Sequence, residues 1–160
     1  MNSIKSTMPI KDATSESFDS EDTSITFKGE GIEWILLPTS DLNLDLEFYE
    51  RTLKLKPLRT GKAKNDPFID DYAILKAPNG VVLELVKPKL EHMDLFKYPI
   101  ICYTVENLVE RYELMRSQNE RLISDIVDTH ETWGWFYVMS RSGTLFQLQG
   151  PLPKKNLSHS

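Results

Sequence analysis

Short apolar segments separated by turn-forming residues run through the middle of the chain and predict alternating strands and helices. The first, at 32–37, is mostly apolar and ends in a turn-forming stretch. Asp41 is placed to cap a helix over 41–53, in which leucine and tyrosine recur at helical spacing. Within 72–86, two apolar runs flank a turn at Gly80, which is the pattern of a β-hairpin.

The second half of the chain repeats this order of elements. A strand at 100–105 is followed by Asn107, which can cap a helix over 107–118, and two strands within 135–149 meet at a turn containing Gly143. The register agrees as well, because positions in the two halves match at a constant separation. The matching positions are Gly80, Glu84 and Pro88 against Gly143, Gln147 and Pro151. The pattern therefore predicts an internal repeat.

We accordingly divide the chain into one domain and two tails. The domain covers 29–151 and contains two modules, at about 31–88 and 99–151. Residues 1–28 are acidic, rich in serine and threonine and without apolar periodicity, which predicts a flexible tail. Residues 152–160 are short and polar, and we expect a loose C-terminal tail there.

Composition narrows the functional classes. The 160 residues are 40% apolar and carry a formal net charge of −5, which argues against a nucleic-acid partner. No apolar run approaches the roughly 20 residues that span a bilayer, so we expect no membrane partner either. The single cysteine, Cys102, excludes an internal disulfide and fits a cytoplasmic location. The sequence lacks a phosphate-binding glycine loop, a paired-cysteine motif and a serine-hydrolase elbow.

Four stretches of the domain carry family motifs. They are Asp41-Leu42 with Glu47-Phe48-Tyr49-Glu50-Arg51, Pro78-Asn79-Gly80-Val81-Val82-Leu83-Glu84-Leu85, Trp133-Gly134, and Ser142-Gly143-Thr144-Leu145-Phe146-Gln147-Leu148. Together they resemble the vicinal oxygen chelate superfamily, which includes glyoxalase I, bleomycin-resistance proteins and extradiol dioxygenases. The resemblance implies an α+β fold in which two tandem βαβββ modules form a cupped mixed sheet around a central cavity, with the helices outside. It also implies a homodimer.

Strand alternation predicts which side chains would face that cavity, because successive residues of a strand point to opposite faces. The inward set is mostly apolar and aromatic. The residues that we expect to contact a ligand are Trp34, Leu36, Tyr72, Glu84, Cys102, Trp133, Tyr137 and Gln147. No lysine or arginine falls on the inward side of the four strands taken to line the cavity, so we expect desolvation to raise the pKa of Glu84. Cys102 is expected to be a buried, unreactive thiol.

A metal site is the main question that the resemblance raises. Metal-dependent members of the superfamily take their ligands from the first and last strands of each module. The corresponding positions here are Trp34, Glu84, Ile100 and Gln147. Tryptophan and isoleucine cannot ligate, and two ligands hold a divalent ion weakly, so we expect no metal and no other cofactor. The alternative stays open that Glu33 or His130 supplies a further ligand.

The sequence therefore leads to three functional hypotheses. The leading one is metal-independent binding of a small aromatic or amphipathic molecule, with Glu84 and Gln147 as polar anchors. The second is a metal-dependent lyase, isomerase or oxygenase of the glyoxalase or dioxygenase type that uses Glu84 and Gln147 to hold its metal. Glu84 and His130 are the candidate catalytic residues. The third is a non-catalytic protein-interaction module that recruits a partner through the acidic tail. We expect binding rather than catalysis.

Overall fold

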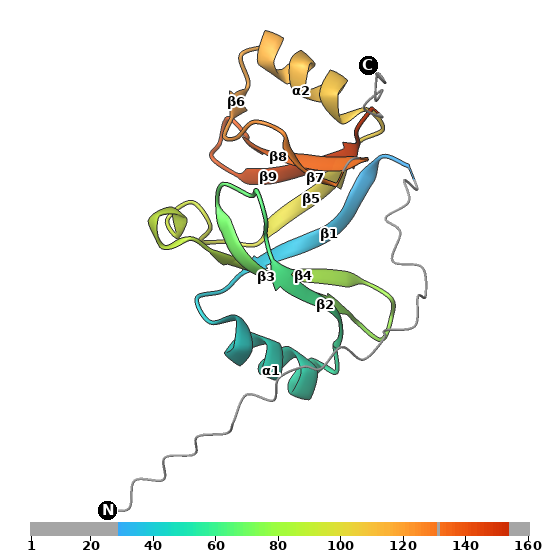
Figure 1. Ribbon diagram of the computed structural model, residues 1–160, viewed down its shortest axis with the longest axis vertical. Helices are drawn as coiled ribbons and strands as arrows, with labels where there is room; N and C mark the ends of the chain where they lie inside the picture. The colour runs from blue at the N-terminus through green and yellow to red at the C-terminus, as the bar shows by residue number, and fades with distance from the viewer. Residues whose placement is uncertain (1–28, 131, 154–160) are drawn as a thin grey trace, which may run out of the picture.

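The computed structural model describes residues 29–130 and 132–153, and the predictions for both tails therefore lie largely outside the described residues. In this part of the chain one mixed sheet of nine strands is covered by two α-helices, an α+β arrangement that does not close into a barrel (Figure 1). The elements are β1 (Gly31–Pro38), α1 (Leu42–Leu53), β2 (Lys56–Lys62), β3 (Ile69–Lys76), β4 (Val82–Pro88), a 3-10 turn (Leu90–His92), β5 (Ile100–Thr104), α2 (Leu108–Ser117), β6 (Arg121–Leu122), β7 (Val127–His130), β8 (Trp133–Met139) and β9 (Leu145–Pro151).

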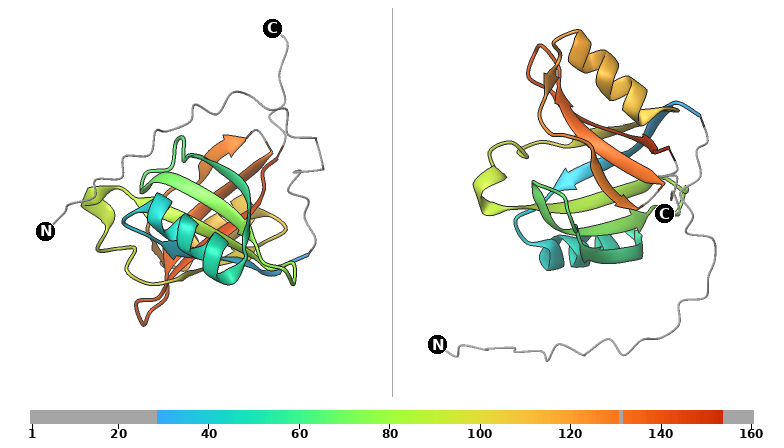
Figure 2. Two further views of the ribbon diagram at one scale, coloured as in Figure 1. Left: turned by 90° about the horizontal axis from the view of Figure 1, so that it is seen from below. Right: turned by 45° about the horizontal axis from the view of Figure 1, so that its top comes forward.

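The internal repeat predicted from the sequence is confirmed by the strand order. The sheet runs β2-β3-β4-β1-β5-β9-β8-β6, with β7 paired to β8. In each module the first strand lies parallel to the last, β1 to β4 and β5 to β9, and β1 and β5 join the modules antiparallel at the centre. The helices lie at opposite ends of the molecule with the sheet between them (Figure 2).

Both helices begin where the capping residues predicted. The Asp41 carboxylate accepts hydrogen bonds from the backbone N–H groups of Asn43 and Leu44, each at 3.1 Å. The Asn107 side chain accepts one from the Glu110 N–H at 3.1 Å. These contacts satisfy N–H groups that the first helical turn leaves without an internal acceptor.

The two faces of the sheet pack as the alternation predicted. On the outer face, Leu85 belongs to a buried cluster to which leucines of α1 contribute, and Leu148 belongs to one with Leu108 of α2. On the inner face, Leu36 and Cys102 are buried in a third cluster that includes Tyr137. This inner cluster supports the cavity described below.

The pattern of apolar residues located only two of the three strands that follow the helix in the first module, and the strand it did not locate is β2. This strand pairs antiparallel with β3 and forms one edge of the sheet. Its sequence, KPLRTGK, gives no apolar alternation because most of the strand is exposed. The short strands β6 and β7 were missed for a related reason, since each has few residues to carry a pattern.

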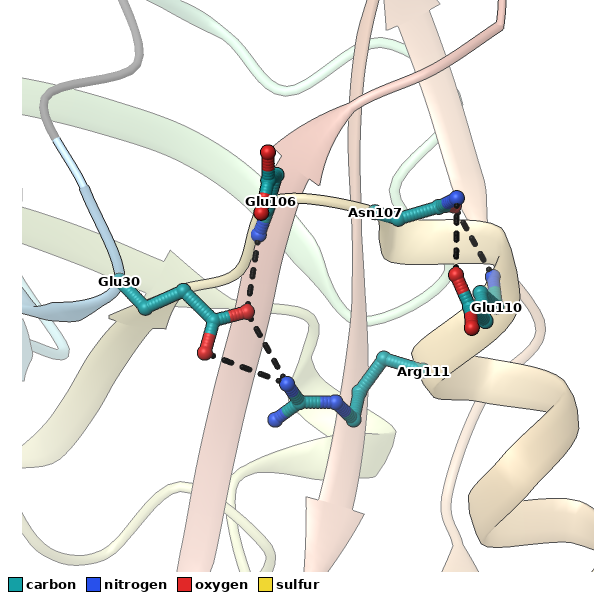
Figure 3. Close-up of polar contacts among 5 residues, drawn as sticks. All are labelled: Glu30, Glu106, Asn107, Glu110 and Arg111. Atoms are coloured by element: carbon teal, nitrogen blue, oxygen red, sulfur yellow. Dashed lines mark hydrogen bonds and ion pairs between the residues drawn. The ribbon is translucent and has the colours of Figure 1, made fainter.

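An ion pair ties the start of β1 to the second module. The Glu30 carboxylate accepts hydrogen bonds from the Glu106 backbone N–H at 3.1 Å and from the Arg111 guanidinium of α2 at 3.0 Å (Figure 3). These contacts, the backbone hydrogen bond first, lower the pKa of Glu30. The residue that precedes the first strand is thereby held against the second module.

Candidate functional site

The inner face of the sheet encloses a cavity of about 480 Å³, and residues of both modules line it. Seven of the eight residues expected to contact a ligand lie in its wall: Trp34, Leu36, Tyr72, Glu84, Trp133, Tyr137 and Gln147. The eighth, Cys102, is fully buried on the same face and does not line the cavity. Burial raises the pKa of its thiol, which fits the expected unreactive side chain.

A larger and more open groove of about 720 Å³ lies elsewhere on the molecule. It is bordered by Tyr112 of α2, by Phe68 and by the segment 122–128. It contains none of the residues that sequence analysis selected, and it lacks the Glu84 and Trp34 groups described next. The enclosed cavity is therefore the candidate site.

Glu84 is a carboxyl of the cavity with a raised pKa. It is half-buried, and it pairs with Leu36 of β1 and Ile74 of β3 across the sheet. Desolvation, followed by the negative charge of Asp66, raises the pKa of Glu84 to about 7. The apolar surroundings of Glu84 in the sequence predicted a raised pKa, and this direction is confirmed. Near neutral pH this carboxyl is able both to donate and to accept a proton.

The indole of Trp34 faces the same part of the cavity and leaves a donor unused. Among the described residues, Trp34 Nε1 is the one buried side-chain nitrogen or oxygen with no hydrogen-bond partner. It lies near enough to Glu84 to lower the pKa of that carboxyl, although the contact does not reach hydrogen-bond geometry. A buried donor without an acceptor is unfavourable and calls for a physical explanation.

Asp66, which sequence analysis did not select, is the second acid of the cavity. One oxygen accepts from the backbone N–H groups of Phe68 and Ile69 at 2.8 and 3.0 Å. The other accepts from Trp135 Nε1 at 2.9 Å and from the Tyr137 hydroxyl at 3.1 Å. Asp66 follows β2, whereas both aromatic donors lie on β8, so its carboxylate connects the two modules across the cavity. The sequence Asn65-Asp66-Pro67 signals a turn, but nothing local signals this long-range contact.

Gln147 was expected to face Glu84 across the pseudo-twofold axis, yet its hydrogen bonds go to other residues. Its Oε1 accepts from Cys102 Sγ at 3.1 Å, and its Nε2 donates to the Tyr137 hydroxyl at 3.2 Å. Tyr137 in turn donates to Asp66. The amide is therefore already occupied on both its oxygen and its nitrogen.

Strand β2 and the turn that follows it bring positive charge to the mouth of the cavity. Arg59, Lys62 and Lys64 all line it. The Arg59 guanidinium lies over the Tyr72 ring at 5.8 Å, and Lys62 forms an ion pair with Asp71. The sequence placed no lysine or arginine on the inward side of four strands, and β2 was not among them.

The residues at the family's metal positions do not fit a metal ion. Trp34 presents an N–H donor, Ile100 is part of the inner core, and Gln147 is hydrogen-bonded through both amide atoms. Glu84 alone remains as an available ligand. No group of three or more histidine, cysteine or acidic side chains suited to a metal occurs among the residues that the structure describes. His130 ends β7, and its side chain lies outside the described atoms.

Comparison with known proteins supports the fold. No protein-family model and no curated protein matches the sequence. Methylmalonyl-CoA epimerase from Mycobacterium tuberculosis superposes with a TM-score of 0.61 at 19% identity, covering 77% of this chain and 89% of its own. A glyoxalase/bleomycin resistance protein/dioxygenase superfamily member from Vibrio splendidus gives 0.56 at 16% identity, covering 78% and 100%.

Another similar structure contains a bound compound. A Streptomyces coelicolor methylmalonyl-CoA epimerase with 2-nitronate-propionyl-CoA superposes with a TM-score of 0.58 at 18% identity, covering 76% of this chain and 97% of its own. At such identities the similarity concerns the fold.

Among the described residues, no helix is long and apolar enough to cross a membrane.

Proposed function

We propose that this chain, which has the vicinal oxygen chelate fold, binds a small and largely planar molecule in the cavity without a metal ion. The body of the ligand contacts the aromatic and apolar side chains of the cavity, and one oxygen atom of the ligand lies between Trp34 and Glu84. In metal-dependent proteins of the same fold family, residues at these two positions bind the metal ion. Here it presents a hydrogen-bond donor and a carboxyl instead.

The observation that carries the proposal is the unpaired indole N–H of Trp34. A carbonyl oxygen that accepts from Trp34 Nε1 removes the penalty of this buried donor, which is about 1–3 kcal/mol for such groups. Glu84, with a pKa of about 7, donates to the same oxygen when it is protonated. Two converging donors select a ligand with an acceptor atom over a purely apolar one.

Acid–base catalysis at Glu84 is the second candidate function. A carboxyl with a pKa of about 7 is suited to accept or return a proton at neutral pH. The epimerases of the same fold are enzymes, but their activity is a property of those proteins, and the low identity does not transfer it. Turnover of a bound carbonyl compound, lost in Glu84→Gln while binding persists, would distinguish catalysis from binding alone.

The test of binding uses methyl naphthyl ketone and its hydrocarbon analogue, ethylnaphthalene. After exhaustive treatment with a chelator, the protein should bind the ketone saturably by calorimetry, with an affinity that added zinc or manganese does not improve. Its melting temperature should rise with ketone and should not respond to the chelator alone. Ethylnaphthalene should bind about tenfold more weakly, because it leaves the indole N–H unpaired.

A matched pair of variants locates the site. Ile74 lines the cavity, so Ile74→Trp should fill it and reduce ketone binding at least about tenfold. Leu114 lies exposed on α2, and Leu114→Trp should leave the affinity unchanged. Metal bound stoichiometrically after purification, with ketone binding lost on chelation, would contradict the proposal.

A further inference from the structure

We infer that the natural ligand of this cavity is an organic anion, held with its acidic group at the β2 rim beside Arg59 and Lys64 and its apolar body directed toward Trp34. The inference rests on the proposed function and specifies the chemical class of the ligand.

The cations at the rim are available to a ligand. Arg59 and Lys64 are exposed and line the cavity, and neither forms an ion pair with an acid in the described part of the chain. The Arg59 guanidinium is positioned by its contact with the Tyr72 ring. Lys62, between them, is neutralised by Asp71. A chain with a formal net charge of −5 thus places two uncompensated cations at the entrance of its cavity.

The acids of the cavity set the orientation of the ligand. Asp66 is 4% exposed, and its oxygens already accept four hydrogen bonds from described residues. Glu84 lies on β4, two strands away from the β2 edge. An anionic group placed beside Glu84 would face two carboxyls, whereas the same group at the rim faces two cations. The charges therefore favour an acidic group beside Arg59 and Lys64, and a neutral acceptor oxygen between Trp34 and Glu84.

The side chains that line the cavity between these two ends indicate the shape and polarity of the ligand's body. The aromatic side chains of Tyr72, Trp34 and Trp135 line the cavity along with aliphatic groups. Flat aromatic rings favour stacking and edge contacts with a planar ligand. The ligand that fits these contacts is an aromatic or conjugated acid with a carbonyl group remote from the carboxylate. Its carbonyl oxygen lies at Trp34 and Glu84, its ring contacts the aromatic side chains, and its carboxylate lies beside Arg59 and Lys64.

Two probes that differ by one group test the inference. Methyl naphthyl ketone carries the acceptor oxygen alone, and an acetylnaphthoic acid carries in addition a carboxylate on the ring remote from the ketone. The wild-type protein should bind the acid about fivefold more tightly than the ketone at low salt, and this ratio should shrink as salt is added. The double substitution Arg59→Gln with Lys64→Gln should bring the ratio of the two dissociation constants close to one.

The control is Lys56→Gln. Lys56 is an exposed cation on the same strand, but it does not line the cavity, so this variant should keep the wild-type ratio. Thermal melts of all variants verify that each is folded. A ratio of one in the wild type, or an equal loss of ratio in Lys56→Gln, would overturn the inference while ketone binding leaves the proposed function standing. Failure of both probes to bind would overturn the two together.

Discussion

Replacing Asp66 with alanine should lower the free energy of unfolding by about 3–5 kcal/mol, because it leaves several buried donors without an acceptor. The carboxylate accepts from two backbone N–H groups and from the side chains of Trp135 and Tyr137. Tyr137 is fully buried, so water cannot replace the lost acceptor there. Equilibrium unfolding in urea, monitored by tryptophan fluorescence, measures the change.

Two further variants control this experiment. Asp94→Ala removes a carboxylate whose side chain is 97% exposed, and it should change the stability by less than about 1 kcal/mol. Asp66→Asn keeps the shape of the side chain but removes its charge, so the pKa of Glu84 should fall, as carbon NMR of the Glu84 carboxyl would show. If Asp66→Ala were no more damaging than Asp94→Ala, the contact between the modules would not contribute to stability.

Glu84→Gln should abolish a pH dependence of stability that the wild type shows between about pH 4.5 and pH 7. The pKa of Glu84 is raised from 4.5 in the unfolded chain to about 7 in the folded protein, so folding favours the protonated form. The stabilisation is complete below the unfolded value, decreases as the pH rises through this range, and levels off above the folded value. The full difference corresponds to about 3 kcal/mol.

The measurement is the difference in unfolding free energy between wild type and variant across the pH range. Taking this difference cancels the titration of every other group that the substitution leaves alone. Glu84→Gln should become more stable relative to the wild type as the pH rises from about 5 to about 8. A difference that stays constant, or that changes in the opposite direction, would mean that Glu84 is solvated or paired with a cation in the folded protein.

Most of the fold could be predicted because its signals are local. Asp41 and Asn107 start their helices through contacts within three residues, and the hairpin glycines Gly80 and Gly143 adopt positive φ angles of 89° and 91°. Inward and outward residues of the central strands alternate because one face packs on helices and the other lines the inner core. The apolar pattern could not locate the edge strand β2, since an exposed strand needs no apolar side.

Part of the site could also be predicted, because the signals for that part are local. The raised pKa of Glu84 followed from its position on an apolar strand face. The role of Asp66 did not, because its donors Trp135 and Tyr137 lie 69 and 71 residues further along the chain. The partners of Gln147 were also missed, since alternation gives the face of a side chain and not the neighbour that reaches it first.

Ligand binding at Trp34 without a metal can be followed by nitrogen-edited NMR of the three tryptophan indoles. Methyl naphthyl ketone is titrated into chelator-treated protein, and the Nε1–H resonances are followed. Trp34, which gains an acceptor, should show the largest downfield shift. Trp133 and Trp135 should show smaller shifts, because they already donate to Gln149 and Asp66. A Trp34 resonance that stays in place while the ketone binds, or that moves only after metal is restored, would contradict metal-free binding at Trp34.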